Sequence, residues 1–217
     1  EGVELEPGSN EVNRKLFESS VALYGKMLDY VANKKMRNAF YISRLCNNYN
    51  GTPISCQQFY NLYLSAYKRH ILSHNIVVNE DGQFVSFSSI QLPFKDSKLD
   101  VDLYGNCSLL NKACLPAEKD YQAWFDITDF TIFREQKYTY ENLAKQIDSK
   151  VNIYSFGKTS NEILTWLYQC AKYFKDCDRY IFSRYKLLPN QSGNLCTINN
   201  LLYADVNLSA ELKEIYD

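Results

Sequence analysis

Residues 30–79 read YVANKKMRNAFYISRLCNNYNGTPISCQQFYNLYLSAYKRHILSHNIVVN. This segment contains no Asp and no Glu, although acidic residues make up 25 of the 217 residues of the chain. The formal net charge of the chain is −1, and the segment carries +6, so the remaining residues carry −7. The basic residues of the segment are Lys34, Lys35, Arg37, Arg44, Lys68 and Arg69.

Two interpretations of this charge segregation stay open. An electropositive helical surface would attract nucleic acid or another anionic partner. A buried pair of helices would also need few charges of either sign, and the segment is rich in Tyr, Leu and Ile. The six basic side chains are the candidate binding residues, and we expect them to neutralise phosphates rather than to identify bases.

The pattern around this segment predicts helices followed by a hairpin. One helix is expected from Asn10 to Asn33, a second over residues 36–47, and a third that opens at Thr52-Pro53. A hairpin follows, because an Asp-Gly turn at 81–82 separates two β-rich runs. The first helix has most of its apolar residues on or near one face: Val12, Leu16, Leu23, Met27, Leu28 and Val31.

The order helix, turn, helix, hairpin resembles the order of elements in winged-helix domains. In such domains the second helix enters a groove of the nucleic acid and the hairpin forms the wing. The resemblance is one of element order, and the sequence carries no family motif that would support it further.

The remainder of the chain predicts a mixture of strands and helices. Alternating or β-rich runs predict strands at 99–103, 123–133 and 151–156, and helices are expected at 140–148, 161–174 and 209–216. The run 179–188 interleaves cations with aromatic residues, as in strands with one polar face and in sites that bind a single strand. The fold class is therefore α+β: a helical N-terminal half (about 10–75) with a hairpin, packed against a mixed or antiparallel sheet with further helices.

Domain organisation and location follow from composition. Residues 1–9 predict a flexible acidic lead-in, and residues 10–217 a single α+β domain with a sub-domain boundary near 89–97. Seven loosely spaced cysteines favour free thiols in an intracellular compartment, cytoplasm or nucleus. No apolar run reaches the ~18–20 residues that a membrane span needs. The chain begins at Glu1, so we expect a domain of a longer protein.

Two patterns could hold a metal ion. Asp100 and Asp102 would share one face of the expected strand, and Asp126 on another strand could join them, as in enzymes that transfer nucleotides with Mg²⁺. The alternative is that these aspartates form the solvated face of an edge strand. His70 and His74 lie four residues apart on a helix, a spacing that binds zinc in some proteins, but it also suits a helix C-terminus. We expect no cofactor.

The sequence therefore favours a non-catalytic binding domain of a larger protein. Its bias toward Asn, Lys, Tyr and Phe is typical of AT-rich genomes, including those of some viruses, so a viral or replication-related protein is expected. The partner would be nucleic acid or protein, bound through the basic helical surface. Two alternatives stay open: a metal-dependent nucleotidyl-transfer enzyme that uses the paired aspartates, and a structural assembly domain. The sequence does not determine the oligomeric state.

Overall fold

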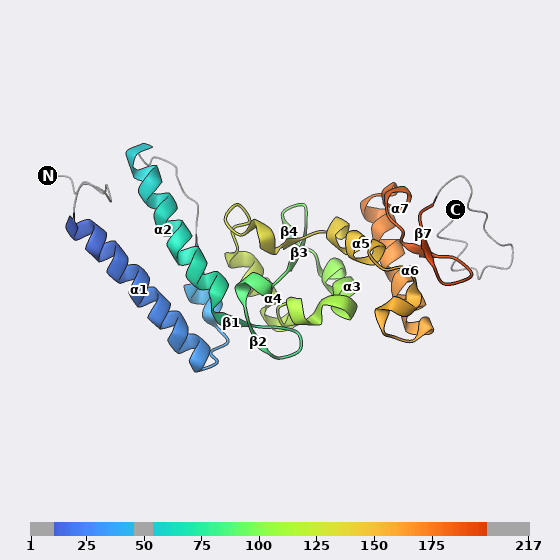
Figure 1. Ribbon diagram of the computed structural model, residues 1–217, viewed down its shortest axis with the longest axis horizontal. Coiled ribbons are helices and arrows are strands. Elements are labelled where there is room, and N and C mark those ends of the chain that lie inside the picture. Colours follow the sequence, from blue (N-terminus) through green and yellow to red (C-terminus); the bar gives the residue numbers. More distant parts are fainter. Residues whose placement is uncertain (1–10, 46–53, 199–217) are drawn as a thin grey trace. The chain divides into compact units, whose positions relative to one another are not determined.

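The computed structural model describes residues 11–45 and 54–198, with side chains from residue 61 in the second range (Figure 1). The chain divides into two compact units. The first unit contains the residues up to Leu92 together with Lys112–Lys137, and the second contains Pro93–Asn111 together with the residues from Tyr138 onward. The chain thus crosses from the first unit to the second at Leu92–Pro93, inside the range 89–97 that the sequence indicates. The expectation of a single domain stays a prediction.

Two long helices open the first unit. Helix α1 (Glu11–Asn33) and helix α2 (Ile54–Ser73) lie side by side in Figure 1 and pack against each other. The ring centroids of Tyr24 and Tyr67 lie 4.7 Å apart. Nearer the start of both helices, the ring of Phe17 lies against that of Tyr63. Because residue numbers rise together along this contact, the two helices run in the same direction.

The predicted hairpin follows α2 directly. Strand β1 (Asn75–Val78) pairs antiparallel with β2 (Phe84–Ser86), and Gly82 in the connecting turn has φ +79°. That left-handed conformation costs glycine little, which explains why the Asp-Gly pair marks the turn. The hairpin prediction is confirmed.

An aromatic core holds the rest of the first unit together. Helix α4 (Glu118–Ile127) buries Trp124 completely, and its indole lies 5.3 Å from the ring of Phe87 and 5.8 Å from that of Phe40. Short 3₁₀ turns supply these neighbours and complete the unit: η1 (Ala39–Ile42), η2 (Phe87–Ser89), η3 (Lys112–Cys114) and η4 (Arg134–Gln136).

The second unit surrounds one central helix. Helix α6 (Ser160–Cys177) packs against α3 (Val101–Asn111), and the Trp166 indole N–H donates to the Asn106 carbonyl at 2.8 Å. Cys107 and Cys170 are buried there as free thiols. The other elements are β3 (Leu92–Lys95), β4 (Lys98–Leu99), β5 (Lys137–Tyr138), α5 (Tyr140–Asp148), η5 (Ile153–Phe156), α7 (Ile181–Arg184), β6 (Leu188–Pro189) and β7 (Leu195–Cys196).

The α+β class is confirmed. In the described residues the sheets are small: β1 with β2, β6 with β7, and a three-stranded sheet in the order β4-β3-β5. Helices α5 and α6 agree closely with the expected 140–148 and 161–174. No helix among the described residues is long and apolar enough to cross a membrane.

Two of the predicted strands are replaced by helices. The run 123–133 lies partly in helix α4, because Tyr121 and Trp124 are spaced to bury on one helical face and the aromatic core outweighs local β-propensity. The run 99–103 enters helix α3 instead. Asp100 caps that helix, since its carboxylate accepts the backbone N–H of Leu103 at 2.8 Å.

Three further expectations need correction. The described part of 36–47 contains the turn η1 rather than a helix, and there Phe40 packs against Trp124. Lys35, with φ +50°, breaks the helical path just after α1. The order expected of a winged helix is therefore not formed in the described residues. Residues 153–156 form a 3₁₀ turn rather than part of the expected strand over 151–156. The run 179–188, which the sequence left open, contains the short helix α7. The predicted lead-in over 1–9, the Thr52-Pro53 opening and the final helix over 209–216 lie outside the described residues.

Candidate functional site

The six predicted basic residues fall into two groups. Four of them have exposed side chains: Lys34, Lys35, Arg44 and Arg69. The other two are used inside the first unit. Arg37 donates to the Asp120 carboxylate at 2.7 Å, and Asp120 is only 12 % exposed, so this ion pair ties the chain after α1 to α4.

Lys68 is also committed to the fold. Its ammonium group donates to the Ile132 carbonyl at 2.7 Å and lies 3.4 Å from the Glu135 carboxylate. The same group lies 5.8 Å from the centre of the Phe133 ring. These contacts hold α2 against the loop that follows α4, which is a structural use of the charge.

The three predicted aspartates do not form the expected cluster on strands. Asp100 and Asp102 lie at the start of helix α3 in the second unit, whereas Asp126 lies on α4 in the first unit. Asp126 accepts a hydrogen bond from Gln122 one turn earlier. Across the described part of the chain, no group of three or more His, Cys, Asp or Glu residues could hold a metal ion.

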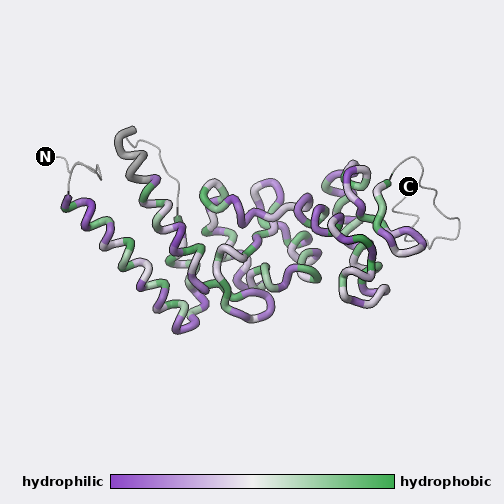
Figure 2. The backbone as a smooth tube through the Cα atoms, viewed as in Figure 1, coloured by the Kyte–Doolittle hydropathy of each residue, from purple (hydrophilic) through white to green (hydrophobic). Residues whose placement is uncertain are grey.

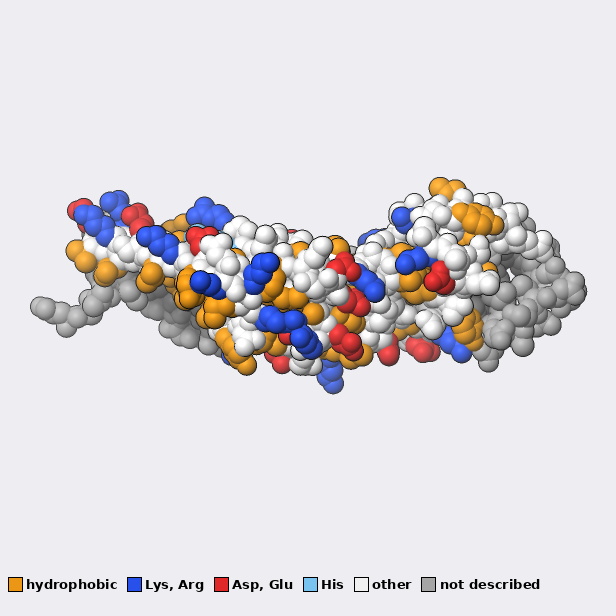
Figure 3. All heavy atoms as spheres, turned by 90° about the horizontal axis from the view of Figure 1, so that it is seen from below, with side chains coloured by type: hydrophobic (Ala, Val, Ile, Leu, Met, Phe, Trp, Pro, Cys, Tyr) orange, Lys and Arg blue, Asp and Glu red, His pale blue; other side chains and the backbone are white. Residues whose placement is uncertain are grey.

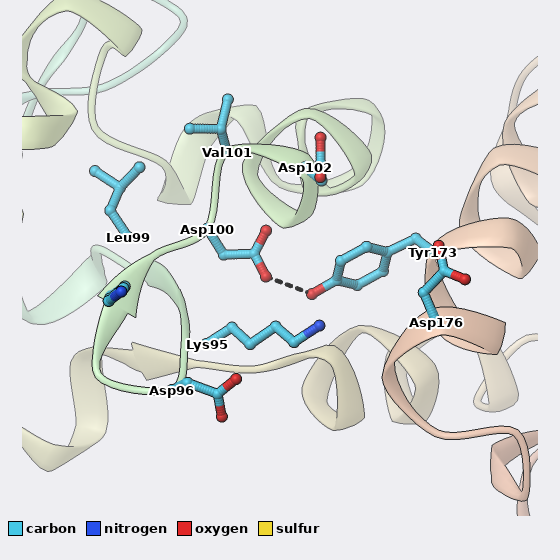
Figure 4. Close-up of a pocket in the computed structure, with 9 residues that line it drawn as sticks. Lys95, Asp96, Leu99, Asp100, Val101, Asp102, Tyr173 and Asp176 are labelled. Atoms are coloured by element: carbon cyan, nitrogen blue, oxygen red, sulfur yellow. Dashed lines mark hydrogen bonds between the residues drawn. The ribbon is translucent and has the colours of Figure 1, made fainter.

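A polar cavity of about 620 Å³ lies beside Asp100 in the second unit (Figure 4). The Tyr173 hydroxyl, from α6, donates to the Asp100 carboxylate at 2.6 Å. Lys95 extends from β3 beneath this pair, and its ammonium group lies 3.4 Å from the Cys177 sulfur. The lining residues are Lys95, Asp96, Lys98, Leu99, Asp100, Val101, Asp102, Tyr173 and Asp176.

The electrostatics of this cavity suit a structural role. Burial raises the pKa of Tyr173, and the hydrogen bond to Asp100 raises it further, so the hydroxyl stays protonated and remains a donor. The hydrogen bond to Cys177 raises the pKa of Lys95, which keeps its ammonium group charged. Asp100 therefore links the cap of α3 to α6, and each of these groups is used within the unit.

Helix α1 presents a second candidate surface, which the sequence pattern alone did not separate from the core. Five large apolar side chains are exposed on it, among them Leu16 by 64 %, Leu23 by 69 %, Met27 by 38 % and Tyr30 by 59 %. Their spacing of seven, four and three residues places them on one line along the helix. We call these four residues the α1 stripe. Val12, which is 63 % exposed, continues the line toward the helix N-terminus.

An adjoining side of α1 is the one that packs on α2. Gly25, Leu28 and Val31 are buried there, and Tyr24 donates from its hydroxyl to the Ile42 carbonyl at 2.8 Å. The expected single apolar face of α1 is therefore wrong: Leu28 and Val31 belong to the packed face and the rest to the exposed line. Hydrophilic and hydrophobic residues alternate along α1 in Figure 2.

The packed face of α1 depends on a close approach at Gly25. A Cβ atom at this position would lie 2.6 Å from Cε1 of His70, so the imidazole ring of α2 occupies the space that a side chain would need. Burial lowers the pKa of His70, and the neighbouring His74 adds to this effect. His74 lies 3.2 Å from the Asp29 carboxylate, so both histidines serve the helix pair.

Large apolar side chains are exposed along α1. In Figure 3, hydrophobic side chains lie among charged ones on the part of the face that α1 forms, at the left. Single exposed apolar residues are normal, but several in one row on one helix are typical of an interaction surface. The sequence analysis assigned one apolar face to α1. The signal that could have separated the stripe is the spacing of seven, four and three residues between Leu16, Leu23, Met27 and Tyr30.

Comparison with known proteins adds no assignment. No protein-family model, curated protein or solved structure matched the chain. The functional argument therefore depends on the geometry of the chain itself.

Proposed function

We propose that this chain is a non-catalytic protein-interaction domain that binds a helical partner through the α1 stripe. The observation that supports the proposal is the row of exposed Leu16, Leu23, Met27 and Tyr30 on a 23-residue helix whose other face is already packed. A partner helix that covers four such side chains would remove their apolar surface from water, at about 25 cal/mol per Å².

The competing sites carry weaker support. In the polar cavity of the second unit, Tyr173 donates a hydrogen bond to Asp100, and Lys95 donates one to Cys177. Two of the six basic residues, Arg37 and Lys68, form internal contacts. The α1 stripe, in contrast, exposes apolar surface that the fold of its own unit does not bury. Helix-in-groove and helix-on-helix recognition both use rows of this spacing.

A display experiment tests this proposal. A library of helical peptides is selected on the immobilised wild-type chain and, in parallel, on the L16E/L23E variant. We expect amphipathic peptides to be enriched on the wild-type chain at least about tenfold over the variant, since two buried charges would cost more than 1.4 kcal/mol. A Leu62→Glu variant is the control, because Leu62 is 57 % exposed on α2, outside the stripe. Equal enrichment on all three chains would overturn the proposal.

We propose nucleic-acid binding as a second candidate function, because four cations of an acid-free segment are exposed: Lys34, Lys35, Arg44 and Arg69. Binding to single- and double-stranded DNA and RNA is measured by fluorescence polarisation over a salt series. K35E/R69E should weaken binding at least about tenfold at low salt, whereas Lys119→Glu on α4 should leave it unchanged. Absence of binding by the wild-type chain at low salt would eliminate this candidate.

A further inference from the structure

We propose that His70 is an acid-sensitive switch in the contact between α1 and α2. A proton taken up by its imidazole drives the ring out of the gap at Gly25 and loosens the helix pair at this point. The switch is a property of the free chain, so it does not depend on the partner proposed for the α1 stripe. It depends on the position of the two histidines of the chain, His70 and His74, which both lie where α2 meets α1.

The ring of His70 fills a gap that Gly25 leaves in α1. A Cβ atom at residue 25 would lie 2.6 Å from Cε1 and 3.0 Å from Nδ1 of the imidazole, so the ring lies directly on the backbone of α1. The ring of Tyr24 lies edge-on to it, with 6.4 Å between the ring centres, and burial raises the pKa of Tyr24, so that its hydroxyl stays neutral. In this position the imidazole loses part of the water shell that an imidazolium ion would hold.

The surroundings of His70 oppose a charge on its ring. On α2, the ring of His74 lies 5.6 Å from that of His70, and Arg69 precedes His70 in the chain. On α1, the Asp29 carboxylate favours the charged form. Strands β1 and β2 and the turn η2, which also pack against these helices, carry no ionisable side chain. Burial, His74 and Arg69 outweigh Asp29, so the pKa of His70 is lowered.

The two histidines respond to acid in opposite ways. Nδ1 of His74 lies 2.6 Å from the His70 carbonyl oxygen, and Nε2 lies 3.2 Å from the Asp29 carboxylate. Both partners are acceptors, so the doubly protonated ring of His74 satisfies both contacts and holds α2 to α1. A second proton, on His70, would then have to share Asp29 with His74 and would meet a like charge beside it. Charge on His74 therefore strengthens the helix pair, and charge on His70 weakens it.

The lowered pKa of His70 fixes the direction of the pH effect. The unfolded chain takes up a proton on His70 at about pH 6.5, whereas the folded chain does so only at lower pH. The stability that the neutral ring contributes is complete above about pH 6.5 and is lost as the pH falls through the folded pKa. Departure of the ring from the gap relieves this cost without unfolding the chain, because the ring contacts of Tyr24 with Tyr67 and of Phe17 with Tyr63 still join the helices.

NMR spectroscopy of the full chain between about pH 7.5 and about pH 5 tests the proposal. The chain has two histidines, so two Cε1–H signals are expected, and the spectra of His70→Gln and His74→Gln assign them. At neutral pH we expect a strong nuclear Overhauser effect between this proton of His70 and the Cα protons of Gly25, because the two groups are in contact. The effect should disappear along the titration curve of His70. An effect that persists after His70 is protonated would overturn the proposal.

The two histidine variants serve as matched controls. His74→Gln removes the like charge and releases Asp29, so the loss of the Overhauser effect should move to higher pH. His70→Gln cannot be protonated, so its urea-unfolding midpoint should not fall between about pH 7 and about pH 5.5, whereas that of the wild-type chain should. An equal fall in His70→Gln and the wild-type chain, or a shift to lower pH in His74→Gln, would contradict the switch. If His70→Gln does not fold, the wild-type titration by NMR decides alone.

Discussion

Helices α1 and α6 are of similar length, 23 and 18 residues, but the units around them use them differently. Helix α6 buries one broad face, which consists of Ile163, Trp166, Leu167, Cys170, Ala171 and Phe174. Helix α1 buries Gly25, Leu28 and Val31 and leaves a second apolar line exposed. The amount of apolar surface on a helix therefore does not determine how much of it the fold will cover.

Local contacts also define the start of α6. Helix α6 begins with a capping box, in which Thr159 accepts the backbone N–H of Glu162 and the Glu162 carboxylate accepts the Thr159 N–H at 3.0 Å. The hydrogen bonds from Thr159 lower the pKa of Glu162. Both the capping box and the packing of its apolar face therefore stabilise α6. Helix α1 packs on α2 along one face only. This contrast can be tested by substitutions.

The largest expected effect comes from the core face of α6. Phe174→Ala should destabilise the chain by about 3–5 kcal/mol, because the ring is 1 % exposed and its removal leaves a cavity. The matched truncation on α1, Tyr30→Ala, removes a side chain that is 59 % exposed and should cost less than about 0.5 kcal/mol. Urea unfolding of both variants measures the difference. Similar losses for the two would show that α1 and α6 are packed alike.

An intermediate effect is expected at the glycines. Gly25→Ala on α1 should destabilise by about 1–2 kcal/mol, because the added methyl group collides with the His70 ring. Gly105→Ala on α3 should instead stabilise by about 1 kcal/mol, since open space surrounds it and alanine favours a helix. The unfolding midpoint of each variant, compared with that of the wild-type chain, shows whether the substitution stabilises or destabilises the fold. Stabilisation by Gly25→Ala would show that the helix pair does not need this close approach.

The smallest expected effect is on the α1 stripe. Leu23→Glu should change the stability of the monomer by no more than about 0.5 kcal/mol, because Leu23 is 69 % exposed. Leu167→Glu on α6 places a charge where the side chain is 3 % exposed, and it should prevent folding. Thermal unfolding measures both. A large loss with Leu23→Glu would show that the stripe is part of the fold of its own unit.

The sequence correctly predicted the elements whose ends are defined by capping or turn residues close by in the chain. Helix α5 and the β1–β2 hairpin follow from capping residues and from the Asp-Gly turn, which act within a few residues. The run 123–133 misled because its β-branched and aromatic residues favour a strand in isolation. Contacts of Trp124 with Phe87 and Phe40, far away in the sequence, determine the helix instead.

The candidate site divides in the same way. The charge segregation and the positions of the six basic residues are properties of the sequence, and so is the apolar content of α1. The sequence does not reveal that Arg37 pairs with Asp120 or that Lys68 donates to the Ile132 carbonyl. In each case the two residues lie more than sixty positions apart in the chain. The sequence also does not state which apolar face of α1 is covered.

The sequence by itself therefore determined the helical start of the chain, the hairpin, the capped helices and the α+β class, because each depends on interactions between near neighbours. The tertiary structure decided which charges are used internally and which apolar line of α1 stays exposed. The physical reason is that one helix face can pack against one neighbour, and α2 occupies the face that contains Gly25, the position at which His70 approaches most closely.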